Sequence, residues 1–275
     1  MAFDYMPYIR QEKMPHMWCP GCGIGTVMKS MIRSFSELEW APEDIAVVSG
    51  IGCTSRLPGY LNVNTLHTTH GRAISFATGI KMHRQDKHVV VISGDGDGSA
   101  IGGNHLIHAA RRNIDITVII NNNNIYGMTG GQYSPTTPLG AKAATAPYGN
   151  LEPSFDLVKL LTGAGASFVA RGQVGNGKQV AQLLKKAFEH KGFSFVEIVS
   201  NCHTQFGRRN KMADPMNMVN WINDRAVSER KWEKMSDDDR AKHFPVGVLH
   251  EDTERPEYCD TYEKLIAKLA EQQSA

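Results

Sequence analysis

The chain has 275 residues, of which 41% are hydrophobic and 21% charged, and its formal net charge is +2 at pH 7. This length and composition predict a globular protein with one large or two small domains, and the near-neutral charge argues against a dedicated nucleic-acid surface. No apolar run approaches the ~18 residues that would span a bilayer, and residues 1–16 lack the apolar core of a signal peptide. We therefore expect a cytoplasmic protein in a reducing compartment, where structural disulfides are disfavoured.

Apolar residues follow a regular alternation of helical and extended patterns between residues 24 and 200. β-Branched runs that end in glycine or polar turns predict strands, and apolar side chains at helical spacing predict helices. In chain order the predicted elements are a helix over 24–38, a strand over 45–49, a helix over 72–84, a strand over 88–93, a helix over 99–112, a strand over 115–120, a helix over 154–162, a strand over 167–170, a helix over 177–190 and a strand over 193–200. This alternation predicts an α/β fold, with a mostly parallel open sheet, helices on both faces and right-handed crossovers.

The two ends of the chain differ in composition from the middle. Residues 1–17 are polar and irregular, and we expect an N-terminal arm that contacts a partner surface. Residues 18–207 are predicted to form the α/β domain. Residues 208–275 are highly charged, with the run KWEKMSDDDR and a final helix predicted around 261–274. They are predicted to be a C-terminal extension that packs on the domain or on a partner.

Polar and glycine-rich loops follow four of the predicted strands, at 50–56, 94–98, 121–131 and 201–207. In an open α/β sheet, ligands bind outside the carboxyl ends of the strands. The four loops therefore place Cys53 and Cys202 on the same rim as Asp95 and Asn123. The long loop at 133–150, rich in Pro, Thr, Ala and Gly, is also expected to be functional, since long loops in compact domains often are.

The sequence Gly94-Asp95-Gly96 follows the strand predicted at 88–93 and precedes a predicted helix. Glycines allow a tight turn that can approach a phosphate, and Asp95 offers the hard oxygen that Mg²⁺ prefers. Asn123 can offer an amide oxygen, and the helix that starts near Ser99 would point its amide N–H groups at an anion in the same place.

The glycine turn is also compatible with two alternatives. An ordinary strand-to-helix turn is one, because glycine turns with an aspartate occur in many proteins. A dinucleotide site is another, but it requires G-x-G-x-x-G with an acidic residue about 20 positions later. Here the second strand ends in asparagines, at 121–124, and not in Asp or Glu.

Five cysteines are present, and an odd number in a reducing compartment indicates metal or redox use of some of them. Cys19 and Cys22 form a CxxC turn, which alone is compatible with a zinc half-site, a redox pair or chance. Cys53 and Cys202 each follow a strand, and four thiolates from scattered positions suit an iron–sulfur cluster. Structural zinc and free thiols are the alternatives. Cys259 lies in the charged tail and is expected to take no part.

Residues 66–73, LHTTHGRA, open the helix predicted at 72–84. His67 and His70 flank the start of this helix, where each is either a turn residue bonded to the backbone or a cofactor contact. Gly71 is expected where two backbones approach closely, and Arg72 to stabilise an anion or a salt bridge.

Six segments together resemble the β subunits of 2-oxoacid:ferredoxin oxidoreductases, and among them those acting on 2-oxoglutarate. The resemblance covers residues 15 to 205, and the segments are WCPGCG, GIGCTSR, HTTHGRA, GDGDGSAIGGNHLIHAARRN, NNNNIYGMTGGQYSPT and SFVEIVSNC. The spacing of GDG, 24 residues (97 to 120) and Asn-Asn is similar to the thiamine-diphosphate motif. The TGGQ that follows is typical of the oxidoreductase family.

The resemblance implies the thiamine-diphosphate-binding fold, thiamine diphosphate with Mg²⁺, and one [4Fe–4S] cluster. It also implies an α subunit, in an αβ or (αβ)₂ assembly, that completes the active site and supplies the activating glutamate. The implied reaction is oxidative decarboxylation of 2-oxoglutarate with coenzyme A to succinyl-CoA and CO₂, with electrons passing through the cluster to ferredoxin. The reverse reaction would fix CO₂. The alternatives are specificity for pyruvate or for a broad range of 2-oxoacids, or a non-catalytic iron–sulfur electron-transfer subunit.

The resemblance also implies roles for individual residues. The implied magnesium ligands are Asp95, the Asn123 side chain and the Ile125 carbonyl, and the implied cluster ligands are Cys19, Cys22, Cys53 and Cys202. The implied cofactor-binding residues are Gly52, Cys53, Thr54, His70, Gly94, Asp95, Gly96, Asp97, Asn123, Ile125, Tyr126, Gly127, Met128 and Thr129.

Arg56 is expected to bind the carboxylate of the 2-oxoacid, because guanidinium can bind a carboxylate bidentately and the related family has a basic residue here. Thr54 and Ser55 are expected beside it as catalytic hydroxyls. The family often has Gly-Cys-Ser-Ser before this basic residue, whereas this chain has Thr54 in place of the first serine, which keeps a hydroxyl. A structural salt bridge or a solvated surface position is the alternative for Arg56.

Overall fold

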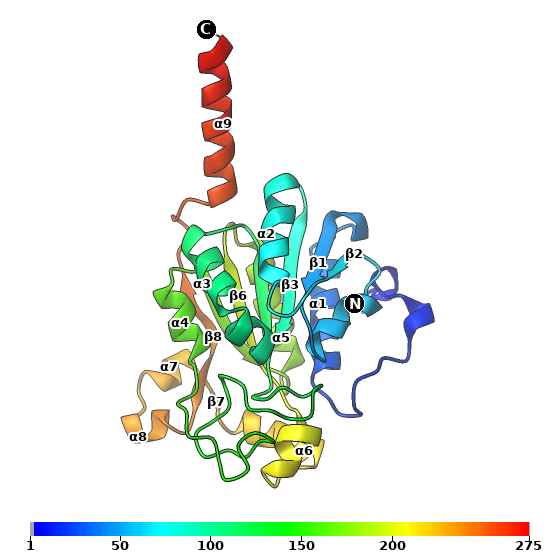
Figure 1. The fold of residues 1–275 in the computed structure, drawn as a ribbon, viewed down its shortest axis with the longest axis vertical. Helices are drawn as coiled ribbons and strands as arrows, with labels where there is room; N and C mark the ends of the chain where they lie inside the picture. Colours follow the sequence, from blue (N-terminus) through cyan, green and yellow to red (C-terminus); the bar gives the residue numbers. More distant parts are fainter. Residues whose placement is uncertain (1–2, 275) are drawn as a thin grey trace.

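The computed structural model describes residues 3–274 and is built around one eight-stranded sheet (Figure 1). The strand order is β2-β1-β3-β4-β6-β5-β8-β7. The strands are β1 (Ile45–Ser49), β2 (Asn64–His67), β3 (His88–Gly94), β4 (Thr117–Asn122), β5 (Phe168–Gln173), β6 (Ser194–Val199), β7 (Ala226–Ser228) and β8 (Phe244–Glu251). Neighbouring strands pair in parallel except β5 and β8, which are antiparallel.

Nine α-helices are present within residues 3–274, and none of them is long and apolar enough to cross a membrane. They are α1 (Ile24–Glu37), α2 (Ala73–His83), α3 (Gly103–Arg112), α4 (Leu157–Gly163), α5 (Gly177–Glu189), α6 (Pro215–Asn223), α7 (Glu229–Trp232), α8 (Asp237–Arg240) and α9 (Tyr258–Ser274). Short 3₁₀ helices are η1 (Met6–Tyr8), η2 (Gln11–Lys13), η3 (Pro42–Asp44) and η4 (Thr54–Tyr60), and two π-helical turns are η5 (Gly96–Ile101) and η6 (His203–Gly207).

Helices cover both faces of the sheet, which confirms the predicted architecture. Alternate side chains of a strand point to opposite faces, so Val90 of β3 belongs to one core and Val91 to the other. The first core contains the apolar faces of α1 and α5, including Phe35. The second contains those of α2, α3 and α4, including Leu106 and Leu161. Strands buried on both faces explain why their sequences are continuous apolar runs.

Every element predicted between residues 24 and 200 is present, with ends that differ by up to four residues. The helix predicted from residue 154 begins at Leu157, and the strand predicted to end at residue 170 continues to Gln173. The helix predicted at 99–112 is preceded by the π-helical turn η5, which starts at Gly96. The strand predicted at 115–120 extends to Asn122, because the side chains of both asparagines find buried partners: Asn121 donates to Thr54 of η4 and Asn122 to Glu197 of β6. Asparagine is depleted in strands, so a sequence pattern does not extend a strand into an asparagine run.

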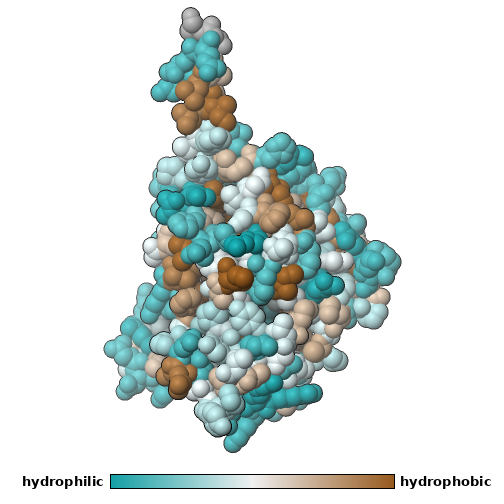
Figure 2. Space-filling view, viewed as in Figure 1, coloured by the Kyte–Doolittle hydropathy of each residue, from teal (hydrophilic) through white to brown (hydrophobic). Residues whose placement is uncertain are grey.

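The C-terminal extension, residues 208–275, contributes two strands to the sheet. β8 extends the sheet beyond β5, and β7 forms the edge. The predicted final helix is confirmed as α9, which projects away from the body with apolar side chains exposed along it (Figures 1 and 2). Glu257 holds its first turn, accepting hydrogen bonds from the backbone N–H groups of Cys259 and Asp260 at 2.7 and 2.8 Å.

The described part of the predicted N-terminal arm packs partly on its own domain. Tyr8 is buried beside Phe35, and its hydroxyl donates to the carbonyl of Trp40 at 2.9 Å. Ile9 forms a β-bridge with Leu61. Contact of this segment with a partner chain stays a prediction, as does the division of the chain into three segments, whose outermost residues, 1–2 and 275, lie outside the described range.

Candidate active site

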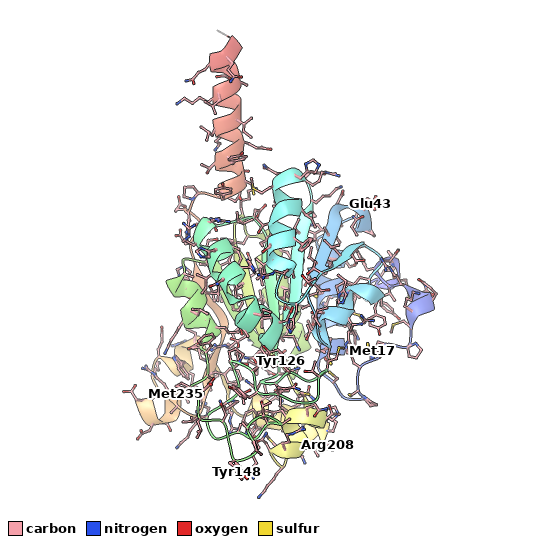
Figure 3. All side chains as sticks on the ribbon, viewed as in Figure 1. Met17, Glu43, Tyr126, Tyr148, Arg208 and Met235 are labelled. Atoms are coloured by element: carbon pink, nitrogen blue, oxygen red, sulfur yellow. The ribbon has the colours of Figure 1, made fainter. Side chains whose placement is uncertain are left out.

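A pocket opens where β1, β3 and β4 end, at the rim predicted to carry the site, and Tyr126 is labelled there in Figure 3. All fourteen residues expected to bind a cofactor line this pocket, together with Ile51. The lining residues are Ile51, Gly52, Cys53, Thr54, His70, Gly94, Asp95, Gly96, Asp97, Asn123, Ile125, Tyr126, Gly127, Met128 and Thr129. The enclosed space is about 80 Å³.

The GDG turn needs glycine for a reason that the sequence does not show. Neither Gly94 nor Gly96 has a positive φ, so the turn itself does not require glycine at these positions. A Cβ atom at Gly96 would instead overlap the ring of Tyr126, whose hydroxyl donates to the Gly96 carbonyl at 3.0 Å. Gly96 therefore permits the close approach of Tyr126 to the pocket wall.

Asp95 is only 1% exposed and is held by the loop at 133–137. Its Oδ2 atom accepts hydrogen bonds from the hydroxyls of Ser134 and Thr136, the latter at 2.8 Å. Burial raises the pKa of Asp95 to about 6, although these hydroxyl hydrogen bonds oppose the rise. The carboxylate is thus a buried negative charge. Its other oxygen, Oδ1, accepts a long hydrogen bond from the backbone N–H of Asn123 at 3.4 Å and faces the side chain of that residue.

The Asn123 amide can take either of two orientations beside Asp95, and in one of them three acceptor oxygens face one another. The side-chain oxygen of Asn123 lies 3.3 Å from Asp95 Oδ1 and 2.8 Å from the carbonyl oxygen of Ile125. Rotating the amide by half a turn would let its NH₂ group donate to both. In the unrotated orientation, these two separations are close to the edges of a Mg²⁺ octahedron, which are about 3 Å for metal–oxygen bonds of about 2.1 Å. These oxygens therefore fit a magnesium ion, and they belong to the three residues predicted as its ligands.

Asp97 braces three loops of the site. Its Oδ1 atom accepts from the backbone N–H groups of Gly71 and Ile51, at 2.8 and 3.2 Å, and contacts His70 Nδ1. Its Oδ2 atom accepts from the Ser93 hydroxyl at 2.5 Å. Because these protein groups occupy both oxygens, the structure gives Asp97 a positioning role, and a direct cofactor contact stays a prediction. His70 contacts the side chain of Asp97 and not the backbone of its own turn, and it lines the pocket, so its cofactor contact stays a prediction.

The four cysteines predicted as ligands come together from distant parts of the chain. The Sγ atoms of Cys19 and Cys202 each lie 3.8 Å from the Thr204 hydroxyl, so both thiols flank one side chain. Burial, and then the proximity of the other three thiols, raises the pKa of Cys22 to about 12. Within residues 3–274, no three His, Cys, Asp or Glu side chains are arranged to hold one metal ion.

The thiols adjoin the cofactor pocket. Cys53 lines the pocket, as does Gly127. A Cβ atom on Gly127 would lie 3.3 Å from Cys202 Sγ and 4.0 Å from Cys53 Sγ. Cys259 is separate from this group, since it is buried in the core with its Sγ 3.6 Å from the sulfur of Met82 in α2.

The three residues predicted to act on the substrate differ in their surroundings. The Thr54 hydroxyl lines the pocket and accepts a hydrogen bond from Asn121 Nδ2 at 3.1 Å. The Ser55 hydroxyl is buried without a partner among the described residues, and Ser55 does not line the pocket. Arg56 is exposed, so its guanidinium is accessible to an anion. The roles of all three in catalysis stay predictions.

The sequence analysis did not identify Ser134 and Thr136, whose hydroxyls hydrogen-bond to the Asp95 carboxylate. Ser134 and Thr136 were covered only by the expectation that the long loop is functional. A usable signal was the hydroxyl-rich run SPTT directly after GGQY. It also missed Arg171 and Glu197, a buried ion pair at 2.7 Å between β5 and β6, because charged residues in a sequence are usually on the surface.

Comparisons with known proteins agree on one family. Residues 50–198 match the thiamine pyrophosphate enzyme, C-terminal TPP binding domain. The chain is 51% identical over 264 residues to 2-oxoglutarate synthase subunit KorB of Methanocaldococcus jannaschii, which covers 96% of this chain and 97% of that protein. It is 44% identical over 265 residues to the subunit of the same name from Archaeoglobus fulgidus, covering 96% and 95%.

A solved structure is also similar over nearly the whole chain. It is the 2-oxoglutarate:ferredoxin oxidoreductase from Magnetococcus marinus with 2-oxoglutarate, coenzyme A and succinyl-CoA bound, with a TM-score of 0.86, 34% sequence identity, and coverage of 98% of this chain and 91% of that one. The family resemblance of the sequence motifs is thereby confirmed. The chain belongs to the KorB family of 2-oxoglutarate synthase β subunits and contains a thiamine-diphosphate-binding domain.

Proposed function

We propose that this chain is the catalytic β subunit of a 2-oxoglutarate:ferredoxin oxidoreductase. The reaction converts 2-oxoglutarate and coenzyme A into succinyl-CoA and CO₂, and the two electrons released reduce ferredoxin. One observation carries the proposal: Cys53 lines the same pocket as the magnesium-type oxygens, and Cys202 adjoins that pocket beside Gly127. Cys19 and Cys22 lie near Cys202. Non-oxidative decarboxylation needs no such thiol group beside the cofactor.

Asp95, Asn123 and the Ile125 carbonyl would hold Mg²⁺, which completes its coordination with diphosphate and water. Thiamine diphosphate, when bound, supplies the electron sink that makes loss of CO₂ from a 2-oxoacid possible. The chain itself contributes a pocket wall that excludes water, because Asp95 and Asp97 are almost fully buried. Tyr126 closes one side of the turn through its contact with Gly96.

The four thiols would hold one [4Fe–4S] cluster, the group that accepts electrons one at a time. Cys22 is half-buried and its pKa is raised, so it is protonated in the free chain and would lose its proton on ligation. The nearby Thr204 hydroxyl could donate to a ligand sulfur. This arrangement supports electron transfer over a short distance from the pocket.

The pocket is incomplete within this chain, which supports an α subunit as partner. Its space of about 80 Å³ is small compared with the roughly 300–1,000 Å³ typical of ligand sites. None of its fifteen described lining residues is a glutamate, so the glutamate that activates the cofactor would come from the partner. Arg56, exposed beside the pocket residues Cys53 and Thr54, would bind the substrate carboxylate in the assembled site.

The test is a panel of 2-oxoacids offered to the purified, anaerobic complex with coenzyme A, with reduction of ferredoxin or viologen as the readout. We expect 2-oxoglutarate to have the highest kcat/KM. Asp95→Asn should lose reduction, whereas Asp86→Asn, which alters an exposed aspartate paired with Arg84, should not. A higher kcat/KM for pyruvate would contradict the proposal that 2-oxoglutarate is the substrate. If a complex with thiamine diphosphate bound reduced ferredoxin with none of the 2-oxoacids, the catalytic role would be contradicted.

A further inference from the structure

A continuous series of buried polar contacts leads from Asp95 into the sheet. The Thr136 hydroxyl lies 2.8 Å from Asp95 Oδ2 and 2.9 Å from Asn122 Oδ1, and its single proton can be donated to either. The Asn122 side-chain NH₂ donates to Glu197 Oε1 at 2.7 Å. Glu197 Oε2 accepts from Arg171 Nε at 2.7 Å. Each member therefore fixes the orientation of the next.

The ion pair at the inner end of this series is almost fully enclosed. Glu197 is 3% exposed and Arg171 is 7% exposed, and the two residues face each other across β6 and β5. Burying two charges costs free energy that their attraction does not always recover. Arg171 also donates a hydrogen bond, 2.8 Å long, to Asp156, the residue that caps α4. Capping a short helix needs only Asp156, so it does not account for the buried Glu197.

Asn122 is the point where this series reaches all three proposed magnesium ligands. Its Oδ1 atom accepts from the backbone N–H of Asn124 at 3.1 Å. Asn124 has a φ of 61°, in the left-handed region, and lies between the ligands Asn123 and Ile125. Through Thr136 the same oxygen also faces Asp95. A change in the orientation of Asn122 would therefore move or release each of the three oxygens.

We propose that Glu197 and Arg171 are positioning residues for the magnesium site, acting through Asn122 and Thr136. The inference rests on the proposed function, since it assumes that Mg²⁺ binds at Asp95. Magnesium requires nearly ideal octahedral geometry, so the orientation of its ligands sets the affinity. Loss of such an outer partner typically lowers metal affinity by about 10–100-fold.

The experiment measures the Mg²⁺ concentration that gives half-maximal thiamine diphosphate binding to the metal-stripped complex. Glu197→Gln keeps the size of the side chain but removes the charge opposite Arg171, and it should raise this concentration about tenfold or more. Thr136→Val should also raise it, and Thr136→Ser should restore it by restoring the hydroxyl. In the Thr136→Val background, Glu197→Gln should raise it by less than in the parent, because the connection to Asp95 is already broken while the one through Asn124 remains. Arg171→Lys gives a milder second variant should Glu197→Gln not fold, with a smaller expected rise.

Asp115→Asn is the matched control, since it breaks another buried ion pair, between Lys81 and Asp115 at 2.8 Å, that does not contact the pocket. It should lower the melting temperature and leave the Mg²⁺ requirement unchanged. The inference is overturned if Glu197→Gln and Arg171→Lys need no more Mg²⁺ than this control, or if the effects of Glu197→Gln and Thr136→Val add in full. Binding of thiamine diphosphate to the parent without Mg²⁺ would instead overturn the proposed metal site, and the inference with it.

Discussion

Asp95→Asn should make the metal-free protein more stable while it removes cofactor binding. Burial raises the pKa of this carboxyl from 3.8 to about 6. Because the folded-state pKa is the higher one, ionisation favours the unfolded chain, and stability is lost as the pH rises from about 4 to about 6. About two pKa units at ~1.4 kcal/mol each give a cost of about 3 kcal/mol at neutral pH. Asparagine has a similar size and cannot ionise, so it avoids this cost.

The assay is thermal unfolding of the metal-stripped complex at pH 7.5 and pH 4, with and without Mg²⁺ and thiamine diphosphate. Without ligands at pH 7.5, the variant should melt several degrees above the parent. At pH 4 its advantage should fall below about 1 kcal/mol, since the carboxyl is almost fully protonated in the folded state and only about half ionised in the unfolded state. With Mg²⁺ and cofactor the order should reverse, because only the parent gains stability from binding. A metal-free variant that melts below the parent at pH 7.5 would refute the reasoning.

Three further predictions concern the other parts of the site. Changing any one of the four clustered cysteines to alanine should lower iron and acid-labile sulfide content, whereas Cys259→Ala should not; zinc in place of iron in an anaerobic preparation would contradict the cluster. Arg56→Ala should lower kcat/KM for 2-oxoglutarate by at least about tenfold, or ~1.4 kcal/mol, with Arg56→Lys recovering part of it because the ammonium lacks the planar fork; a change within about twofold would mean that Arg56 is a surface residue. The chain without its partner should turn over no 2-oxoacid, and turnover by the isolated chain would contradict the shared site.

The central fold was predictable because its strands are buried on both faces. The run from His88 to Ser93 is apolar and β-branched, and only a strand or a buried helix suits such a run. The C-terminal strands were not predictable in this way. β8 contains Pro245 and Gly247, which are depleted in strands, and its residues are only half-buried. What places β8 in the sheet is its pairing with β5, and a local pattern does not contain that information.

The pocket residues were predictable from the family motifs, because those motifs follow the strands that form the rim. The residues that contact the pocket residues from outside the pocket were not predictable from those motifs. Thr136 acts on Asp95 across 41 positions, and Arg171 meets Glu197 across 26. Partners that lie far apart in the sequence and share no motif become visible only when the strands are placed side by side. The reason for Gly96 was equally hidden, since it depends on the ring of Tyr126.

The cofactor site and the thiol group are expected to act as one unit, with electrons passing from the pocket to the cluster. Mixing the anaerobic complex with 2-oxoglutarate and coenzyme A, without an external acceptor, tests it directly. We expect the visible absorption of the iron–sulfur cluster to bleach on mixing, and the bleaching to be absent in Asp95→Asn with the cluster still present. An unchanged absorption in a parent complex that contains both thiamine diphosphate and an intact cluster would contradict the claim.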